Sequence, residues 1–364
     1  MKEKMGNYVF IKTGRLDANA ASPNGNYPFF TCAVEPLAIS TYSYDCECVL
    51  VAGNGDLNVK YYNGKFDAYQ RTYIIESRDK TVLSVPYLYF FLMKYVEELR
   101  TLAIGGVIKY IKLGNLTEAK LPIPPLREQE KTVQKLQTLT SLICKKKLQL
   151  QKLDQLASSR FIEMFGDPVA NPKGWSIKKI KEVVAKQKNA LKAGPFGSAL
   201  KKEFYTPSGY KIYGQEQVIN GDAEFGDYYI SQEKYAELKS CAIQAKDVLI
   251  SLVGTYGKTL VIPDEFEPGI INPRLIKITF DQSVINVSYF QAYFSSESLK
   301  AYLDVQTHGC TMGVLNLGII SNLLIPLPPL SLQNEFAAFV EQLDKSKVIC
   351  NKMHKMVEFS LFRV

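Results

Sequence analysis

The sequence contains very little histidine or tryptophan, and its cysteines show no ligand spacing. Only two histidines, His308 and His354, and one tryptophan occur in 364 residues. The seven cysteines are scattered and include no CxxC pair, which disfavours a disulfide framework and is typical of a reducing compartment. A closed zinc site needs four nitrogen or sulfur ligands, so we expect no structural metal.

Long apolar runs and strong charge bias are also missing. No stretch approaches the roughly 20 apolar residues that a membrane helix requires, and the N-terminal segment has no signal-peptide pattern, so we expect a cytoplasmic protein. The net charge of +8 favours a polyanionic partner only mildly. The length suggests two or three domains.

The sequence lacks motifs for catalysis. GKT at 257–259 resembles a phosphate loop, but Leu252 stands where a glycine is required and a strand is expected next. GNG at 53–55 would need its third glycine at Asn58 to bind a dinucleotide. The Asn/Asp-Pro-Pro-aromatic motif of amino-methyltransferases does not occur. We therefore assign this chain no catalytic residue and no cofactor.

The sequence does contain an internal repeat. The proline-rich segment LPIPPLREQ at 121–129 recurs as IPLPPLSLQ at 325–333, a separation of 204 residues (333 minus 129). The same separation aligns Gly105 with Gly309. Each half predicts several short strands, an aromatic-rich helix, a glycine turn and then the proline stretch. Two copies of one module usually do one job twice.

The repeat continues upstream with weaker similarity. FDAYQRTYII at 66–75 parallels GIINPRLIKI at 269–278, which places Arg71 near Arg274 in register. Both segments are rich in β-branched residues and predict strands. The sequence thus predicts two α/β domains with equivalent arginines.

A long helix is predicted after each proline stretch, from Arg127 to about Phe165 and from about Leu332 to the terminus. Apolar residues recur along both, as in a coiled-coil seam with defects. The simplest use of two such helices is to pack on each other, although each could instead pack on its own half. The predicted seam residues are Leu136, Leu139, Ile143, Leu150 and Leu153 in the first helix, and Val340, Leu343, Cys350 and Val357 in the second.

These segments resemble a known family. The proline–helix stretches, with FGDPVANPKGW at 165–175, are similar to the central and distal conserved regions of Type I restriction–modification specificity subunits. The segments at 13–37 and 51–75 resemble one class of target recognition domain, and the segment at 194–218 resembles another. The similarity covers nearly the whole chain.

The resemblance implies two tandem α/β target recognition domains separated by two long antiparallel coiled-coil helices, a pseudo-twofold repeat. It predicts one recognition domain at 1–121, a central helix at 122–168, a second recognition domain at 169–325 and a distal helix at 326–364. The distal helix stops at Val364, and a truncated form and a functional short form are both interpretations.

The resemblance also implies partners. Each domain would read one half of a split double-stranded DNA target, and the helices would fix the gap and dock two modification (methyltransferase) subunits, which a restriction subunit can join. S-adenosylmethionine, ATP and magnesium would then reside on those partners.

The residues themselves indicate DNA contact in the first half. A stretch rich in glycine, amides, cations and tyrosines combines phosphate donors with groups that read base edges; the alternative is a polar hairpin whose tyrosines pack on a sheet. The predicted DNA-contacting residues are Asn54, Asn58, Lys60, Tyr61, Tyr62, Lys65, Tyr69, Gln70 and Arg71.

The second half offers similar groups. Arg274 can contact a base with two hydrogen bonds, or pair with a carboxylate such as Asp264 or Glu265. The predicted DNA-contacting residues here are Phe196, Ser198, Lys201, Lys202, Tyr256, Lys258 and Arg274.

Two rival functions stay open. The chain could be a nuclease or methyltransferase with an unrecognised site, which activity of the purified chain alone would reveal. It could also be a DNA-independent coiled-coil scaffold, whose binding would not change when Lys60, Lys65, Lys201 and Lys202 are neutralised.

Overall fold

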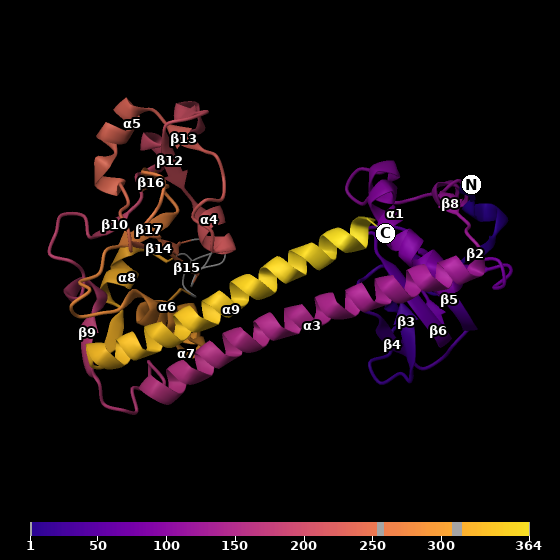
Figure 1. The fold of residues 1–364 in the computed structure, drawn as a ribbon, viewed down its shortest axis with the longest axis horizontal. Helices are drawn as coiled ribbons and strands as arrows, with labels where there is room; N and C mark the ends of the chain where they lie inside the picture. Colours follow the sequence, from indigo (N-terminus) through magenta and orange to yellow (C-terminus); the bar gives the residue numbers. More distant parts are fainter. Residues whose placement is uncertain (1, 253–257, 308–314, 364) are drawn as a thin grey trace. The chain divides into compact units, whose positions relative to one another are not determined.

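The computed structural model describes residues 2–252, 258–307 and 315–363, with side chains in these ranges except at 306–307 and 352–363. It divides into two compact units (Figure 1). Unit 1 comprises residues 1–147 and 351–364, and unit 2 comprises residues 148–350. Both units mix helices and sheets, as the sequence predicts.

Unit 1 is built on a six-stranded sheet in the order β2-β7-β5-β6-β3-β4. All neighbouring strands pair antiparallel except β3 and β6, which run parallel. The strands are β2 (Val9–Thr13), β3 (Tyr27–Phe30), β4 (Leu37–Ile39), β5 (Tyr44–Ala52), β6 (Val59–Ala68) and β7 (Thr72–Ser77).

Because successive side chains of a strand point to opposite faces, the core of unit 1 is divided between the two faces of this sheet. Val49 and Ile75 pack with Leu88 and Leu92 of helix α1 (Val85–Leu102), which begins where the Ser84 hydroxyl accepts a hydrogen bond from the Tyr87 amide. The opposite face buries a smaller cluster that includes Phe66.

A short helix and a strand that pairs with the N-terminal strand precede the first long helix in the sequence. The short helix is α2 (Leu113–Thr117), the strand is β8 (Lys120–Pro122), its N-terminal partner is β1 (Lys2–Lys4), and the long helix is α3 (Leu126–Phe165). Helix α3 begins in unit 1, and its residues 148–165 belong to unit 2. It follows the proline stretch and ends at Phe165, directly before Gly166, whose φ of +81° favours glycine.

Unit 2 contains two four-stranded sheets, β10-β17-β14-β15 and β11-β13-β12-β16, and the pair β9-β18. The strands are β9 (Ser176–Lys179), β10 (Leu191–Ala193), β11 (Tyr205–Thr206), β12 (Tyr210–Tyr213), β13 (Tyr229–Ile230), β14 (Val248–Ser251), β15 (Thr259–Val261), β16 (Gly269–Ile271), β17 (Leu275–Ile278) and β18 (Leu324–Leu327). The helices are α4 (Gln215–Asn220), α5 (Gln232–Glu237), α6 (Val287–Ser295), α7 (Glu297–Thr307), α8 (Leu317–Asn322) and the first part of α9 (Leu330–Arg363), whose residues from 351 on are assigned to unit 1.

Aromatic side chains of unit 2 join its helices. Phe161 and Phe165 of α3 contact Tyr289 of α6 and Phe336 of α9, with ring centroids 4.8 to 5.7 Å apart. Because contacts between aromatic rings stabilise beyond the burial of apolar area, this cluster fixes the beginning of α9 against the end of α3.

The glutamine of each proline motif is buried and clamps the loop before the aromatic helix. The Gln129 Oε1 atom accepts from the Ser84 amide at 3.0 Å, and its Nε2 atom donates to the carbonyls of Val82 and Pro124.

Gln333 makes the same set of bonds in unit 2. Its Oε1 atom accepts from the Asn286 amide at 2.9 Å, and its Nε2 atom donates to the carbonyls of Val284 and Pro328. Both glutamines are fully buried. Each therefore ties the start of a long helix to the start of an aromatic helix.

Replacing either clamp by leucine, Gln129→Leu or Gln333→Leu, is expected to lower the free energy of unfolding by about 2 kcal/mol, because three main-chain groups lose their partner. Urea unfolding measures the change. The exposed Gln134 and Gln342 supply matched controls, whose leucine variants should unfold like the original chain. Equal midpoints for clamp and control variants would show that the clamps do not hold the fold.

Candidate nucleic-acid interface

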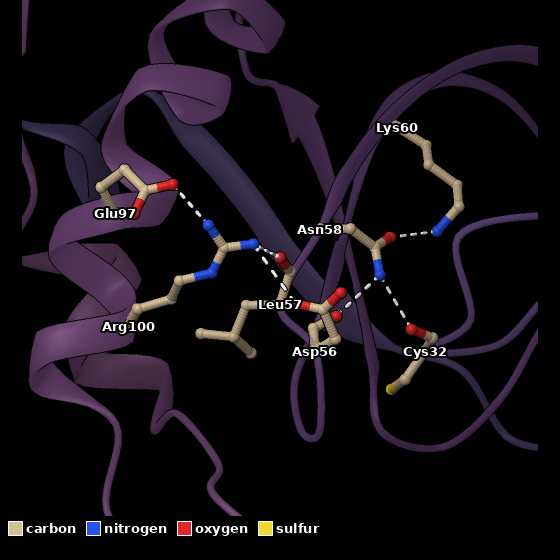
Figure 2. A network of polar contacts seen from close by, with 7 residues as sticks. All are labelled: Cys32, Asp56, Leu57, Asn58, Lys60, Glu97 and Arg100. Atoms are coloured by element: carbon tan, nitrogen blue, oxygen red, sulfur yellow. Dashed lines mark hydrogen bonds and ion pairs between the residues drawn. The ribbon is translucent and has the colours of Figure 1, made fainter. Parts of the chain in front are cut away.

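The loop between β5 and β6, residues 53–58, carries the first predicted contacts (Figure 2). Gly55 has a φ of +70°, which a side chain rarely tolerates. Arg100 of α1 holds the loop, since its Nη2 atom donates to the Leu57 carbonyl at 2.9 Å and lies 3.3 Å from an Asp56 carboxylate oxygen. The loop is thus fixed to the helix beneath it.

Two predicted DNA-contacting side chains are engaged inside the protein. Figure 2 shows the Asn58 Nδ2 atom donating to the carbonyls of Cys32 and Asp56, at 2.8 and 2.9 Å. The Lys60 ammonium donates to the Asn58 Oδ1 atom and to the Ala33 carbonyl. Burial lowers the pKa of Lys60. In this structure, both residues organise the loop.

Tyr61 and Tyr62 are neighbours along β6, so their side chains point to opposite faces of the sheet. Tyr61 donates to Glu47 at 2.8 Å, and burial together with that carboxylate raises the pKa of Tyr61 to about 12. It lines a hollow of about 510 Å³ with residues of α1 and α3, including Tyr89. Tyr62 instead packs on Phe30 and Phe66. Of the two roles predicted for the tyrosines, DNA contact or packing on the sheet, Tyr62 therefore has the second.

The remaining predicted residues of unit 1 are more open. Lys65 is exposed, and its ammonium lies 4.6 Å from the Tyr42 ring centroid. Gln70 is exposed and donates to Asp17 at 2.8 Å. Arg71 is exposed, whereas Asn54 and Tyr69 are half-buried.

Unit 2 exposes most of its predicted residues. Phe196 is 90% exposed, which is unusual for an aromatic side chain without a partner. Ser198, Lys201 and Lys202 follow it and are exposed, with Lys201 3.5 Å from Glu203. The predicted Tyr256 lies outside the described residues.

The side chain of Arg274 pairs with an amide and not with a carboxylate. Its Nη1 atom lies 3.4 Å from the Gln215 Oε1 atom, and Gln215 in turn donates to the Ser251 hydroxyl at 2.8 Å. The proposed pairing with Asp264 or Glu265 is therefore wrong for the described structure. Those acids follow β15, whereas Arg274 precedes β17 beside the start of α4. Nearby, the exposed Lys258 donates to the Ile219 carbonyl at 3.1 Å.

Arg71 and Arg274 occupy equivalent places in the two units. The Gly53 amide donates to the Arg71 carbonyl at 2.8 Å, and the Leu252 amide donates to the Arg274 carbonyl at 3.0 Å. Each arginine directly precedes its strand, β7 or β17, which pairs antiparallel with β5 or β14. The register that the sequence predicts for these two arginines is thus the one that the structure shows.

Further main-chain bonds follow the same equivalence. The Gly14 amide donates to the Thr72 carbonyl at 3.0 Å, as the Gly194 amide does to the Leu275 carbonyl at 2.9 Å. The strands β3 and β6 pair in parallel, as β12 and β16 do. We call this shared set of main-chain hydrogen bonds the main-chain frame. It holds residues 69–71 in unit 1 and residues 272–274 in unit 2.

Two features of this frame were not among the predicted site residues. Gly14 and Gly194 leave no room for a side chain, since a Cβ atom would lie 2.1 Å from the Ala68 carbonyl oxygen or 1.8 Å from that of Asn272. Gln215 orients Arg274. In the sequence, Gly14 ends the triplet KTG and Gly194 ends the triplet KAG, and each precedes a polar loop. The fold is needed to show that these glycines, among the others in the sequence, have no room for a side chain.

The predicted helix seam is the less exposed side of both helices. Leu136 and Leu343 are buried, Cys350 is 2% exposed, and the other predicted seam residues with described side chains are half-buried. In unit 2, polar contacts join α3 to α9, from Arg160 to Glu335 at 3.2 Å and from Asp154 to Lys347 at 2.9 Å. Because the residue numbers rise on one helix as they fall on the other, these segments run antiparallel. The side chain of Val357 lies outside those described.

A family model described as "Type I restriction modification DNA specificity domain" matches residues 2–154 and 172–358. The chain belongs to this family. The match includes both proline motifs, both glutamine clamps and both equivalent arginines, so the repeated features of this specificity-domain protein lie inside the matched regions.

Relatives of this specificity-domain protein are named specificity subunits. The chain is 37% identical to the EcoDI type I restriction enzyme specificity subunit of Escherichia coli over 153 residues, which is 42% of this chain and 34% of the relative. It is 22% identical over 351 residues to a putative specificity subunit of Haemophilus influenzae, covering 91% of this chain and 82% of the relative. The chain thus spans only about a third of the EcoDI subunit.

Solved structures share the fold. The type I S subunit from M. genitalium superposes with a TM-score of 0.59 at 16% identity, covering 99% of this chain and 93% of that one. A chain from work on complex assembly and conformational transition of the type I R-M system gives a TM-score of 0.55 at 16% identity, covering 100% of this chain and 94% of that one. Among the described residues, no helix is long and apolar enough to cross a membrane.

Proposed function

We propose that this protein is the DNA sequence-specificity subunit of a Type I restriction–modification enzyme. The observation that carries the proposal is the pair of equivalent, exposed arginines, Arg71 and Arg274, on one main-chain frame that occurs in each unit. Arginine reads guanine with two hydrogen bonds in the major groove. Two such frames on one chain suit a target in two parts.

The long helices support the second half of the proposal. As an antiparallel coiled coil, α3 and α9 would set a fixed spacing between the two recognised half-sites, and their outer faces would dock two methyltransferase subunits. We expect this chain to contribute no catalytic group. S-adenosylmethionine would bind the modification subunits, and a restriction subunit, where present, would supply the ATP- and magnesium-dependent cleavage.

The test is co-expression with a modification subunit, followed by methylation mapping of the host genome. We expect a split motif with a constant gap. Arg71→Gln should relax one base position in one half of the motif, and Arg274→Gln one position in the other half. Each loss should amount to about 1–3 kcal/mol of discrimination against the wrong base.

The exposed Arg127 on α3 supplies the matched control, and Arg127→Gln should leave the motif unchanged. Methylation by the purified chain alone would favour the enzyme alternative. Complex formation without any sequence-dependent methylation would favour the scaffold alternative. A motif that both arginine variants leave intact would remove these residues from base recognition.

A further inference from the structure

A small hairpin in unit 1, residues 104–110, presents apolar side chains to solvent. Val107 is 103% exposed and Ile108 is 62% exposed. Ile104 and Tyr110, at the base of the hairpin, are also exposed. Exposed apolar groups that gather on one short loop mark a contact surface more often than single ones do.

This hairpin is a built structure. Ile104 and Tyr110 exchange main-chain hydrogen bonds of 3.0 and 2.8 Å across its base. Gly105 has a φ of +124°, and a Cβ atom there would lie 2.5 Å from the Ile108 carbonyl oxygen. The tight turn therefore requires a glycine, and it holds Val107 and Ile108 outward.

Main-chain bonds join the hairpin to the loop at residues 53–58. The Gly55 amide donates to the Lys109 carbonyl at 2.9 Å, and the Ile111 amide donates to the Gly53 carbonyl at 2.9 Å. Gly53 also donates to the carbonyl of Arg71. The apolar tip is therefore fixed to the frame that presents the arginine.

The charges around the tip favour a polyanion. Lys109 within the hairpin and Lys112 just after it are exposed. The nearby carboxylate of Asp56 is paired with Arg100. A surface that combines an apolar tip with flanking cations suits DNA, where phosphates flank the apolar surfaces of the bases.

We infer that Val107 and Ile108 contact the apolar surface of the base pairs in the half-site that unit 1 recognises, while Lys109 contacts a phosphate. The inference rests on the proposed DNA-specificity function. The shared chemistry is apolar contact with bases, and two sources can supply it: the methyl group of thymine in the major groove, or the face of a base that the tip partly unstacks.

The test uses the full chain and a short duplex that it selects from a randomised pool. Binding is measured over a series of salt concentrations for Val107→Ser, Ile108→Ser and Lys109→Gln. Each serine variant should weaken binding about tenfold, from the lost apolar burial, without changing the slope of log affinity against log salt. Lys109→Gln should reduce that slope by about 0.9, because one phosphate contact is lost.

Val82→Ser is the matched control, since Val82 is 39% exposed and lies just before α1, whereas the hairpin follows the end of that helix. It should bind like the original chain. Replacing thymine by deoxyuridine in the duplex tests the methyl source, because binding of the original chain should then fall to that of the serine variants. A rise in 2-aminopurine fluorescence on binding, lost in the serine variants, identifies the unstacked base.

The outcomes separate the inference from the function on which it rests. If the pool yields no preferred duplex, the proposed function fails and the inference fails with it. If a duplex is selected and the serine variants bind it normally, the inference alone is wrong. Serine variants that keep DNA binding but no longer co-purify with the modification subunit would assign the hairpin to protein docking, and that result also overturns the inference.

Discussion

Replacing Gly194 by alanine is expected to abolish recognition of one half-site. The added Cβ atom would lie 1.8 Å from the Asn272 carbonyl oxygen and 2.5 Å from its carbonyl carbon, and both atoms belong to the main chain. No side chain can rotate away to relieve this contact. The loop must therefore move, and the bond from the Gly194 amide to the Leu275 carbonyl breaks.

The displaced segment carries predicted DNA-contacting residues. Phe196, Ser198, Lys201 and Lys202 follow within eight residues of Gly194. Asn272, against which the new methyl group presses, lies two residues before Arg274. We expect unit 2 to lose about 3 kcal/mol of stability from overpacking. In the co-expressed complex, one half of the methylated motif should become degenerate.

Two further glycines control for this result. Gly197 lies in the same loop, and a Cβ atom there meets open space, so Gly197→Ala should leave the motif intact. Gly14 is the counterpart of Gly194 in unit 1, and Gly14→Ala should make the other half of the motif degenerate. If Gly194→Ala and Gly197→Ala methylate the same motif with equal fidelity, the enclosed glycine does not position the interface.

The second large effect is expected at Asp247, a carboxylate that is fully buried in unit 2. One oxygen accepts from the Gln244 amide at 3.0 Å and lies 3.5 Å from the Lys277 ammonium, and the other accepts from the hydroxyl of Thr279. Lys277 is itself only 5% exposed. The alanine variant would leave this ammonium buried without its counter-charge.

Asp247→Ala should therefore destabilise unit 2 by about 3–5 kcal/mol, the usual effect of removing one partner of a buried ion pair. Trp175 is the only tryptophan in the sequence and lies in unit 2, with its indole nitrogen 2.9 Å from the Phe165 carbonyl oxygen. Its fluorescence during urea unfolding reports on this unit.

The double variant Asp247→Asn with Lys277→Met separates charge from packing. It keeps an acceptor for the Gln244 amide and a side chain of similar length at 277, but carries no charge. We expect it to recover most of the stability that Asp247→Ala loses, because an uncharged, well-packed replacement of a buried ion pair is often neutral. If the double variant is as unstable as the alanine variant, hydrogen bonding and not the ion pair dominates at this site.

The long helices could be predicted because their signals are local in the sequence. The absence of glycine and proline predicts a helix from Arg127 to about Phe165, and the structure has it from Leu126 to Phe165. The second helix begins at Leu330, two residues earlier than Leu332. The weaker upstream similarity of residues 66–75 to residues 269–278 places Arg71 and Arg274 in the register that their main-chain bonds show.

The details of the interface could not be predicted, because they depend on contacts between distant segments. Asn58 and Lys60 have the side chains of DNA-contacting residues, but the fold brings the carbonyls of residues 32 and 33 close enough to bind them. The partner of Arg274 comes from a residue 59 positions away, and the partners of Gln129 from up to 47 positions away. The spacing of residues in the sequence does not predict contacts between segments so far apart.

The main-chain frame around Arg71 and Arg274 has a consequence for how the protein can change. The bonds that define the frame join amides and carbonyls of residues 14, 53, 69, 71 and 72 in unit 1 and of residues 194, 252, 272, 274 and 275 in unit 2. They depend little on which side chains stand at positions 70 and 71, or at 273 and 274. Variation at these positions can therefore accumulate with little penalty to folding. Under the proposed function, each unit would then acquire a new preference while the other keeps its own. A randomised library confined to these four codons would sample new targets from a single inherited scaffold.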